Sequence, residues 1–345
     1  MDGNRVATFA GFVGALAVLA VLVWVVGVDR TVTALLSADP VALVFVAVVA
    51  LVWLTTWGLA LWSVLRALGS PVRAHTAVLV YAGAVFSNNV TPFGQAGGEP
   101  LSALIIASAA DTEYETGLAA IASVDTVHFV PSIGFAIAGF TFVTADAVQL
   151  GRNLVFAAVA VAALAVGLPV AAFLGWRYRY ELEATAVRLL TPAIRWVGRV
   201  VPKWSPPTAD SIEARIESFF VAIERIATDR QTLLQTLGFS GLGWACLAGS
   251  LWLSLYAVGH TVPVSVALLV VPVGSIASLA PLPGGSGAIE AVLVTLLVST
   301  TAVPGAVATS AVLVHRGATY LFPLLLGAAV ASALGADRAA ANTRE

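Results

Sequence analysis

Long uninterrupted hydrophobic runs alternate with short polar loops over most of the chain. Six of these runs are long enough to cross the roughly 30 Å hydrocarbon core of a bilayer, which takes about 20 apolar residues in a helix. They are residues 6–28, 40–65, 117–143, 153–176, 232–258 and 305–332. This pattern predicts an all-α polytopic membrane protein with about six full transmembrane helices.

Two further hydrophobic regions, 74–110 and 264–302, are interrupted by polar and helix-breaking residues. The first break runs from Asn88 to Pro100, and its flanking arms of about 14 and 10 residues would be only about 15–21 Å long as helices. The second break runs from Pro281 to Glu290. Irregular backbone at membrane depth survives only where protein buries it or where it lines a cavity. We therefore expect two re-entrant helical hairpins whose tips border a polar pathway.

The two breaks share the pattern Pro-x-Gly-x-x-x-x-Glu, with a fixed offset of 191 in residue number. Matches at the same offset occur outside the pattern as well. Trp53, Gly58, Ser63 and Asp125 correspond in this way to Trp244, Gly249, Ser254 and Arg316. We interpret residues 40–143 and 232–332 as two copies of one unit, since repetition at a fixed spacing is the mark of an internal duplication. Coincidence in a chain rich in Ala, Val, Gly and Leu is the alternative.

Composition agrees with the membrane class. The 345 residues are 59% hydrophobic and 10% charged, with a mean hydropathy of +0.95, far from the values of a soluble domain. The single cysteine, Cys246, excludes an intrachain disulfide and a cysteine-built metal site. No nucleotide-binding loop, metal-ligand cluster or cofactor motif is found. We expect one transmembrane domain (1–345) without a cofactor and without nucleic acid as a partner.

The basic residues indicate the orientation in the membrane. With both termini cytoplasmic and each hairpin returning to its own side, fourteen Lys and Arg lie inside and two lie outside, as the positive-inside rule requires. Many of the inside charges belong to the connector 177–230, which we expect to be cytoplasmic and partly an amphipathic helix. The two hairpins then open to opposite sides, so the units 40–143 and 232–332 are expected to be inverted repeats. Many secondary transporters have this architecture.

The polar residues at the breaks and inside the crossings are the candidate binding residues. They are Asn88, Asn89, Thr91, Pro92, Gly94, Gln95, Glu99, Asp125, His128, Pro281, Pro283, Gly284, Gly285, Glu290, His315 and Arg316. The amides and hydroxyls suit a lipid headgroup, or they satisfy the local backbone. The two glutamates either cap the second arms or bind a cation, a proton or Arg316. Because a charged side chain facing lipid is costly, we expect Arg316 to face a carboxylate or a polar cavity.

The motifs resemble those of the lysylphosphatidylglycerol synthase transmembrane-region family. The segments Asn88-Asn89-x-Thr91-Pro92-x-Gly94 and Pro281-x-Pro283-Gly284-Gly285-x-Gly287-x-x-Glu290, together with Arg316, carry the resemblance over nearly the whole chain. It implies a flippase-like protein of the cell membrane that moves a phospholipid or polyprenyl-linked lipid, with both hairpins in the pathway. Relatives often carry a basic residue where this chain has Phe93 and Gly94, and Glu-Arg near Val124-Asp125. The chain holds no synthase domain, so aminoacyl transfer is not implied.

Other functions compete with lipid translocation. An ion-coupled transporter of a small solute would use the same architecture. An intramembrane serine protease would use Ser286, in a Gly-x-Ser-Gly turn, with His315 as its base; the matching residue in the first break, however, is Gln95. A membrane scaffold is the third alternative. The expected partners are a membrane lipid or lipid-linked substrate and a separately encoded lipid-modifying enzyme, while the coupling ion, the direction and the oligomeric state stay open.

Overall fold

The computed structural model describes residues 32–33, 36–91, 95–145, 159, 161–178, 181 and 209–330. These residues are helical, and no strand occurs among them. Five helices are long and apolar enough to cross a membrane, namely Pro40–Ala67, Tyr114–Thr144, Arg230–Ala257, Pro283–Thr300 and Gly305–Val330. The expected helical membrane fold is thus confirmed. The expected crossing 6–28 and most of the connector 177–230 lie outside the described residues.

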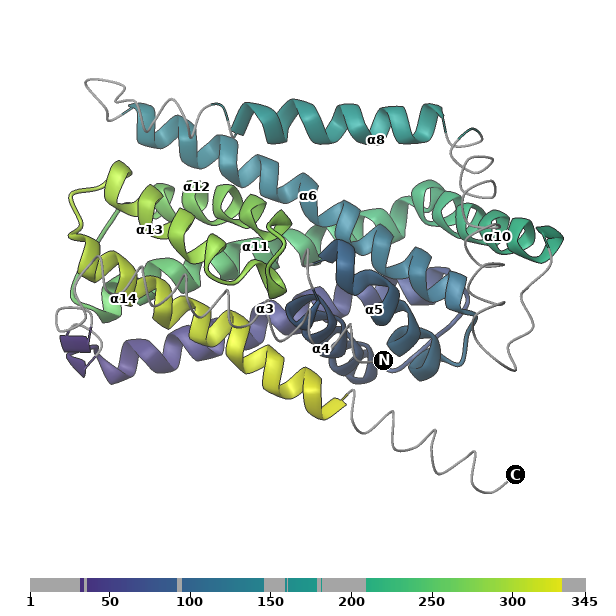
Figure 1. Cartoon of the computed structure of the whole chain (residues 1–345), viewed down its shortest axis with the longest axis horizontal. Helices are drawn as coiled ribbons and strands as arrows, with labels where there is room; N and C mark the ends of the chain where they lie inside the picture. Colours follow the sequence, from purple (N-terminus) through teal and green to yellow (C-terminus); the bar gives the residue numbers. More distant parts are fainter. Residues whose placement is uncertain are drawn as a thin grey trace.

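Helices α3 (Pro40–Ala67) and α11 (Arg230–Ala257) pack side by side along the long axis of the molecule (Figure 1). They run antiparallel, because the Asp39 N–H at the start of α3 donates to the Ala257 carbonyl oxygen at the end of α11 over 2.8 Å. Near the opposite end the Ser63 and Thr236 hydroxyls are 2.9 Å apart. Buried hydroxyl pairs of this kind join helices in a membrane, where lipid competes for apolar contacts.

Helices α4 (Ala74–Val90) and α5 (Gln95–Ala110) form the first hairpin. They lie so close that a Cβ on Gly98 would be 2.6 Å from the Asn88 Cα atom. The helices have 17 and 16 residues, about 24–26 Å each, so the predicted arms of about 14 and 10 residues were too short. The reason is that α4 continues through both asparagines and α5 already contains Pro100.

The second hairpin is less regular. Helix α12 (Val264–Ser275) continues into the 3₁₀ turn η2 (Ile276–Leu279), and a second 3₁₀ turn, η3 (Pro283–Gly285), precedes α13 (Ala288–Thr300). Three glycines of this segment, Gly284, Gly285 and Gly287, have φ angles of 57°, 63° and 84°. An L side chain rarely adopts this left-handed region, which explains why the tip of the hairpin is built from glycine.

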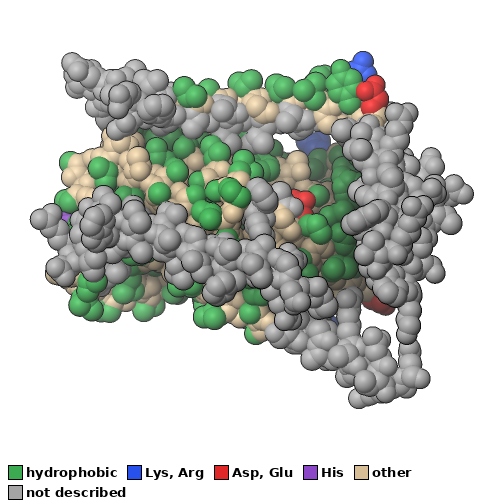
Figure 2. Space-filling view, viewed as in Figure 1, with side chains coloured by type: hydrophobic (Ala, Val, Ile, Leu, Met, Phe, Trp, Pro, Cys, Tyr) green, Lys and Arg blue, Asp and Glu red, His purple; other side chains and the backbone are tan. Residues whose placement is uncertain are grey.

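Two long helices complete the described bundle. Helix α6 (Tyr114–Ala145) packs on α5 and α12, and α14 (Gly305–Arg316) continues through the π-helical turn η4 (Gly317–Leu321) to residue 330. Helices α4 and α5 lie toward one end of the long axis and α12 and α13 toward the other (Figure 1). Among the coloured side chains of Figure 2, hydrophobic ones are frequent and charged ones are few, as expected of a surface that meets lipid.

Two further helices follow α6 in the chain, one at the end of the predicted crossing 153–176 and one in the connector 177–230. Helix α8 (Leu168–Arg177) follows the π-helical turn η1 (Ala163–Gly167), and α10 (Ala209–Thr228) packs on α6. Helix α10 is fixed to α6 by an ion pair of 2.7 Å between Arg215 and Glu115. The Arg215 side chain is 62% exposed, so this pair lies at the surface of the helical bundle.

The described helices support a duplication but correct its offset. Asp39 and Asp229 cap α3 and α11, and Gly69 and Gly259 follow these helices with φ angles of 85° and 82°. Near the end of each helix a tryptophan side chain donates to the backbone carbonyl ten residues later in the chain: Trp62 to Val72 over 3.1 Å and Trp252 to Val262 over 2.9 Å. The members of each of these pairs are 190 positions apart in the chain. The starts of α6 and α14, Tyr114 and Gly305, are 191 positions apart.

The predicted matches Trp53–Trp244, Gly58–Gly249 and Ser63–Ser254 are therefore wrong by one residue. The two units differ by one residue in the segment before the Pro-x-Gly motif, because Pro92 follows the start of α4 by 18 positions and Pro283 follows the start of α12 by 19. The predicted offset still relates Glu99 to Glu290 and Asp125 to Arg316. The antiparallel course of α3 and α11 favours our interpretation of inverted units.

Candidate substrate cavity between the two breaks

The two breaks touch each other in the middle of the bundle. The hydroxyl of Tyr320 donates to the backbone oxygen of Asn89 over 3.3 Å. A Cβ on Gly284 would lie 3.0 Å from the Asn89 Cα atom and 2.7 Å from a ring carbon of Tyr320. The two breaks are therefore in direct contact at Asn89 and Gly284. Pro92 and Gly94 lie outside the described residues, as does the side chain of Gln95.

A cavity of about 340 Å³ lies where the breaks meet. Seven predicted site residues line it, from both units of the chain: Asn88, Asn89, Asp125, His128, Gly284, His315 and Arg316. Six others are not among the lining residues: Thr91, Glu99, Pro281, Pro283, Gly285 and Glu290. The Thr91 hydroxyl donates to the Ser87 carbonyl oxygen over 2.8 Å, so this residue caps its own helix, which was the alternative to headgroup binding.

Six buried polar atoms that belong to the lining residues have no hydrogen-bond partner among the described residues. They are Trp53 Nε1, Asn88 Oδ1, Asn89 Nδ2, Asp125 Oδ2, His128 Nε2 and Arg316 Nη2. A buried polar group without a partner costs about 1–3 kcal/mol. Such a concentration of donors and acceptors around one cavity suits a polar ligand or water that would satisfy them.

Arg316 and Glu290 form an ion pair that joins α14 to the first turn of α13. The Arg316 Nε donates to Glu290 Oε1 over 2.7 Å, and the Gly287 N–H donates to the other carboxylate oxygen over 2.5 Å. Glu290 therefore both caps its helix and pairs with the arginine, which had been considered as alternatives. The guanidinium also lies 4.7 Å from the ring centre of Tyr320. Its Nη2 atom is left for the cavity.

Each cavity histidine is held by a serine of α11. His128 Nδ1 lies 2.7 Å from the Ser240 hydroxyl, and His315 Nδ1 lies 2.9 Å from the Ser250 hydroxyl. These hydrogen bonds orient both rings so that the other ring edge remains for the cavity. The serines were not predicted, since a serine in an apolar helix is common and only the fold brings it to a histidine.

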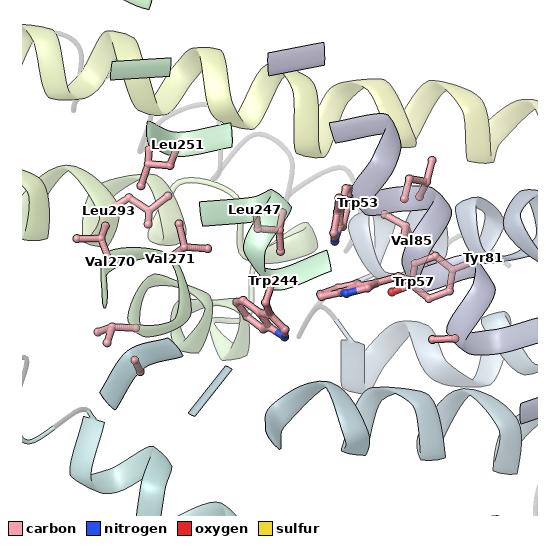
Figure 3. Close-up of a cluster of buried hydrophobic side chains, with 14 of the residues drawn as sticks. Trp53, Trp57, Tyr81, Val85, Trp244, Leu247, Leu251, Val270, Val271 and Leu293 are labelled. Carbon is pink, nitrogen blue, oxygen red and sulfur yellow. The ribbon is translucent and has the colours of Figure 1, made fainter. Parts of the chain in front are cut away.

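Aromatic rings form a wall of the cavity that the sequence did not predict. Trp57 stacks on His128 with ring centres 4.0 Å apart and meets Trp53, Trp244 and Tyr81 edge to face at 5.4–6.3 Å. Figure 3 shows Trp57 between Tyr81 and Trp244. Tryptophans in a membrane protein are otherwise typical of helix packing and of the membrane interfaces. The spacing of Trp53 and Trp57, one helical turn apart, was the signal of a shared face.

The cavity reaches the apolar surface of the molecule. Two of its lining residues, Leu279 of η2 and Phe129 of α6, are 68% and 38% exposed. Other lining residues are polar and little exposed, such as Asn89 at 9% and the side chain of Arg316 at 15%. The cavity therefore combines buried polar groups with an apolar rim that faces outward. Among the described residues no cluster of His, Cys, Asp and Glu has the composition of a metal site.

Comparisons with known proteins agree with this architecture. The family model described as the lysylphosphatidylglycerol synthase TM region matches residues 11–327. A UPF0104 membrane protein of Methanothermobacter thermautotrophicus is 26% identical over 333 residues, which cover 94% of this chain and 92% of that protein. A UPF0104 membrane protein of Pyrococcus horikoshii is 24% identical over 317 residues, or 89% and 91% of the two chains. The chain is therefore a multi-pass membrane protein that belongs to the lysylphosphatidylglycerol synthase transmembrane-region family.

Proposed function

We propose that this protein is a flippase-like transporter that moves a phospholipid or a polyprenyl-linked lipid between the leaflets of the cell membrane. The observation that carries the proposal is the cavity where the two breaks meet, which is lined both by buried polar atoms without partners among the described residues and by two exposed apolar residues, Phe129 and Leu279. A lipid has the same two parts, a polar headgroup and apolar chains. Its polar headgroup would contact the buried polar atoms and its chains would leave past Phe129 and Leu279.

The apolar rim distinguishes a lipid from a small solute. A solute carrier needs a central site that is closed toward the membrane, whereas a lipid must keep its chains in the bilayer while its headgroup crosses. The exposure of Leu279, which also lines the cavity, favours the lipid. An ion-coupled solute transporter is the second candidate, because the same unpaired donors and acceptors would suit a polar solute.

A headgroup phosphate has suitable partners among the buried lining residues. Arg316 Nη2 and Asn89 Nδ2 are donors without partners among the described residues. Arg316 pairs with Glu290 through Nε, so Nη2 can still donate a hydrogen bond to a phosphate, while the Glu290 carboxylate weakens the attraction of the guanidinium for the anion. Hydrogen bonds between charged groups are roughly twice as strong as neutral ones.

Neither a protease nor a scaffold is favoured by the geometry. A serine protease would need Ser286 to contact His315, but His315 Nδ1 is hydrogen-bonded to Ser250 instead. A scaffold would have no use for a cavity lined by unpaired buried polar atoms. In our proposal both termini are cytoplasmic, and a separately encoded lipid-modifying enzyme supplies or consumes the lipid.

The test is a flipping assay in proteoliposomes. The purified full chain is reconstituted with fluorescently labelled phospholipids of several headgroups, or with dolichyl phosphate, and the fraction accessible from outside is followed with time. We expect faster movement than in empty liposomes for at least one lipid, and loss of that movement in Arg316→Gln. Arg215→Gln at the surface is the matched control. No movement above empty liposomes for any lipid of the panel would contradict the proposal.

A further inference from the structure

The two units differ in charge at one pair of equivalent positions. Glu290 and Arg316 of the second unit form an ion pair across a separation of 26 residues in the chain. Glu99 and Asp125 of the first unit have the same separation and lie at the corresponding positions. Where the second unit has a carboxylate and a guanidinium, the first unit therefore has two carboxylates.

The fold places these two carboxylates on neighbouring helices. Helices α5 and α6 are neighbours, and a Cβ on Gly117 of α6 would lie 2.7 Å from the Ala103 carbonyl oxygen of α5. Glu99 and Asp125 therefore lie on two helices that are in direct contact. Asp125 is only 5% exposed and Glu99 is partly buried. Among the described residues no guanidinium pairs with either carboxylate in the way that Arg316 pairs with Glu290.

Unpaired groups point to a ligand at this place. Asp125 Oδ2 has no hydrogen-bond partner among the described residues, and neither has Nε2 of His128, which is 3% exposed and one helical turn further along α6. Both side chains line the cavity. Each therefore has a polar atom directed to a position that no described side chain fills.

The other described ionisable groups around Asp125 supply no free cation. They are Tyr81 from α4, Glu99 from α5, His128 from α6 itself, Glu290 from α13, and His315 and Arg316 from α14. Arg316 is held by Glu290 over 2.7 Å, and both histidines are bound through Nδ1 to serines of α11. An unpaired carboxylate in a membrane interior is expensive, and two carboxylates that share a site cannot both ionise without a large cost.

We propose that Glu99 and Asp125 form a proton-binding site, in which a mobile proton takes the place that the Arg316 guanidinium occupies in the second unit. Binding adds one proton to one carboxylate, which becomes a carboxylic acid, and release restores the charge. A proton fits better than a metal ion, because the described residues contain no group of three or more suitable metal ligands. If the proposed lipid transport is correct, this site couples lipid movement to a proton gradient.

The site itself is tested without any transport. Infrared spectra of the reconstituted full chain are recorded during a pH titration, and the carbonyl stretch of a protonated carboxylic acid is followed. We expect a titrating band that is lost in Asp125→Asn and in Glu99→Gln. Glu115→Gln, whose carboxylate is paired with Arg215 outside the cavity, keeps the band. Absence of the band in the wild type, or its persistence in both cavity variants, overturns the proposal.

A charge replacement sharpens the test. Asp125→Arg gives the first unit the fixed cation of the second, so Glu99 should lose its need for a proton and the band should disappear. Thermal unfolding followed by fluorescence checks that this variant is folded. If it is not folded, loss of the infrared band in Asp125→Asn remains the test of the site.

Coupling is tested in the flipping assay with an imposed pH gradient or an imposed sodium gradient. We expect the flipping rate to respond to the pH gradient in the wild type and not in Asp125→Asn. A flipping rate that does not change with the pH gradient, or that changes with the sodium gradient, overturns proton coupling. It does not contradict lipid transport itself. Absence of flipping in every condition contradicts the lipid function, while the infrared band still reports on the site.

Discussion

Gly284 of the second break packs directly on Asn89 of the first. The Asn89 Cα atom is 3.0 Å from the position of a Cβ on residue 284, and that residue has a φ angle of 57°. The short distance and the left-handed backbone both disfavour a residue larger than glycine at position 284. The contact joins two segments that belong to different units of the chain and fixes the floor of the cavity, which the proposed lipid headgroup would reach.

Gly284→Ala is therefore expected to separate the two breaks. The added methyl group would also lie 2.7 Å from the Tyr320 ring and 2.8 Å from Asn89 Oδ1, and the left-handed backbone adds strain of about 1–2 kcal/mol. We predict a lower melting temperature in detergent and loss of flipping. Gly238→Ala is the control, because this glycine of α11 has no atom within 4 Å of its Cβ position. Equal behaviour of the two variants would refute the close contact.

Breaking the Arg316–Glu290 pair should destabilise the protein strongly. The two side chains are 15% and 5% exposed, and removing one partner of a buried pair leaves a charge uncompensated, at a cost of about 3–5 kcal/mol. We predict this loss for Glu290→Leu in chemical unfolding experiments. Glu290→Leu combined with Arg316→Met should recover part of the stability, since no charge is then left alone.

The surface pair Arg215–Glu115 provides the comparison. Arg215 is 62% exposed, and exposed ion pairs contribute about 0–1 kcal/mol. Arg215→Gln should therefore change the free energy of unfolding by no more than about a third of the change seen in Glu290→Leu. A similar loss for both variants would show that Arg316 and Glu290 are not paired in a water-poor interior.

Ser240→Ala is predicted to loosen the aromatic wall. The Ser240 hydroxyl holds His128 Nδ1 at 2.7 Å, and His128 in turn stacks on Trp57. Loss of a buried hydrogen bond that leaves its partner unsatisfied costs about 1–3 kcal/mol. We expect reduced stability and a changed tryptophan emission spectrum. Ser218→Ala on α10, whose hydroxyl bonds only to its own helix, should change neither quantity.

The hydrophobic pattern predicted the main helices because length and apolarity alone decide which segments can cross a bilayer. Helices α3, α6, α11 and α14 correspond to predicted crossings. The hairpin helices were predicted too short, since Asn88 and Glu99 were counted as part of the break although both lie in helices. Polar side chains can end a helix or simply point from one into a cavity, and the sequence does not distinguish the two.

The sequence predicted the site residues that are ionisable, because a charged side chain inside a membrane is costly. It missed several uncharged site residues, which cost little there. Arg316 and Asp125 stood out because an ionised side chain in a crossing needs a reason, and both line the cavity. Trp57, Ser240 and Ser250 did not stand out, because such residues also occur in helices without a site. Only the packing of α11 against α3, α6 and α14 gives them their neighbours.

The central claim is that a lipid enters the cavity past Leu279, and modification of that residue tests it most directly. Leu279→Cys is made in a Cys246→Ala background, and its flipping rate is measured before and after reaction with a bulky maleimide. Val221→Cys, on the exposed face of α10, is treated in the same way as the control. We predict that modification at position 279 blocks flipping and that modification at position 221 does not. Unchanged flipping with position 279 fully modified would contradict the proposed pathway.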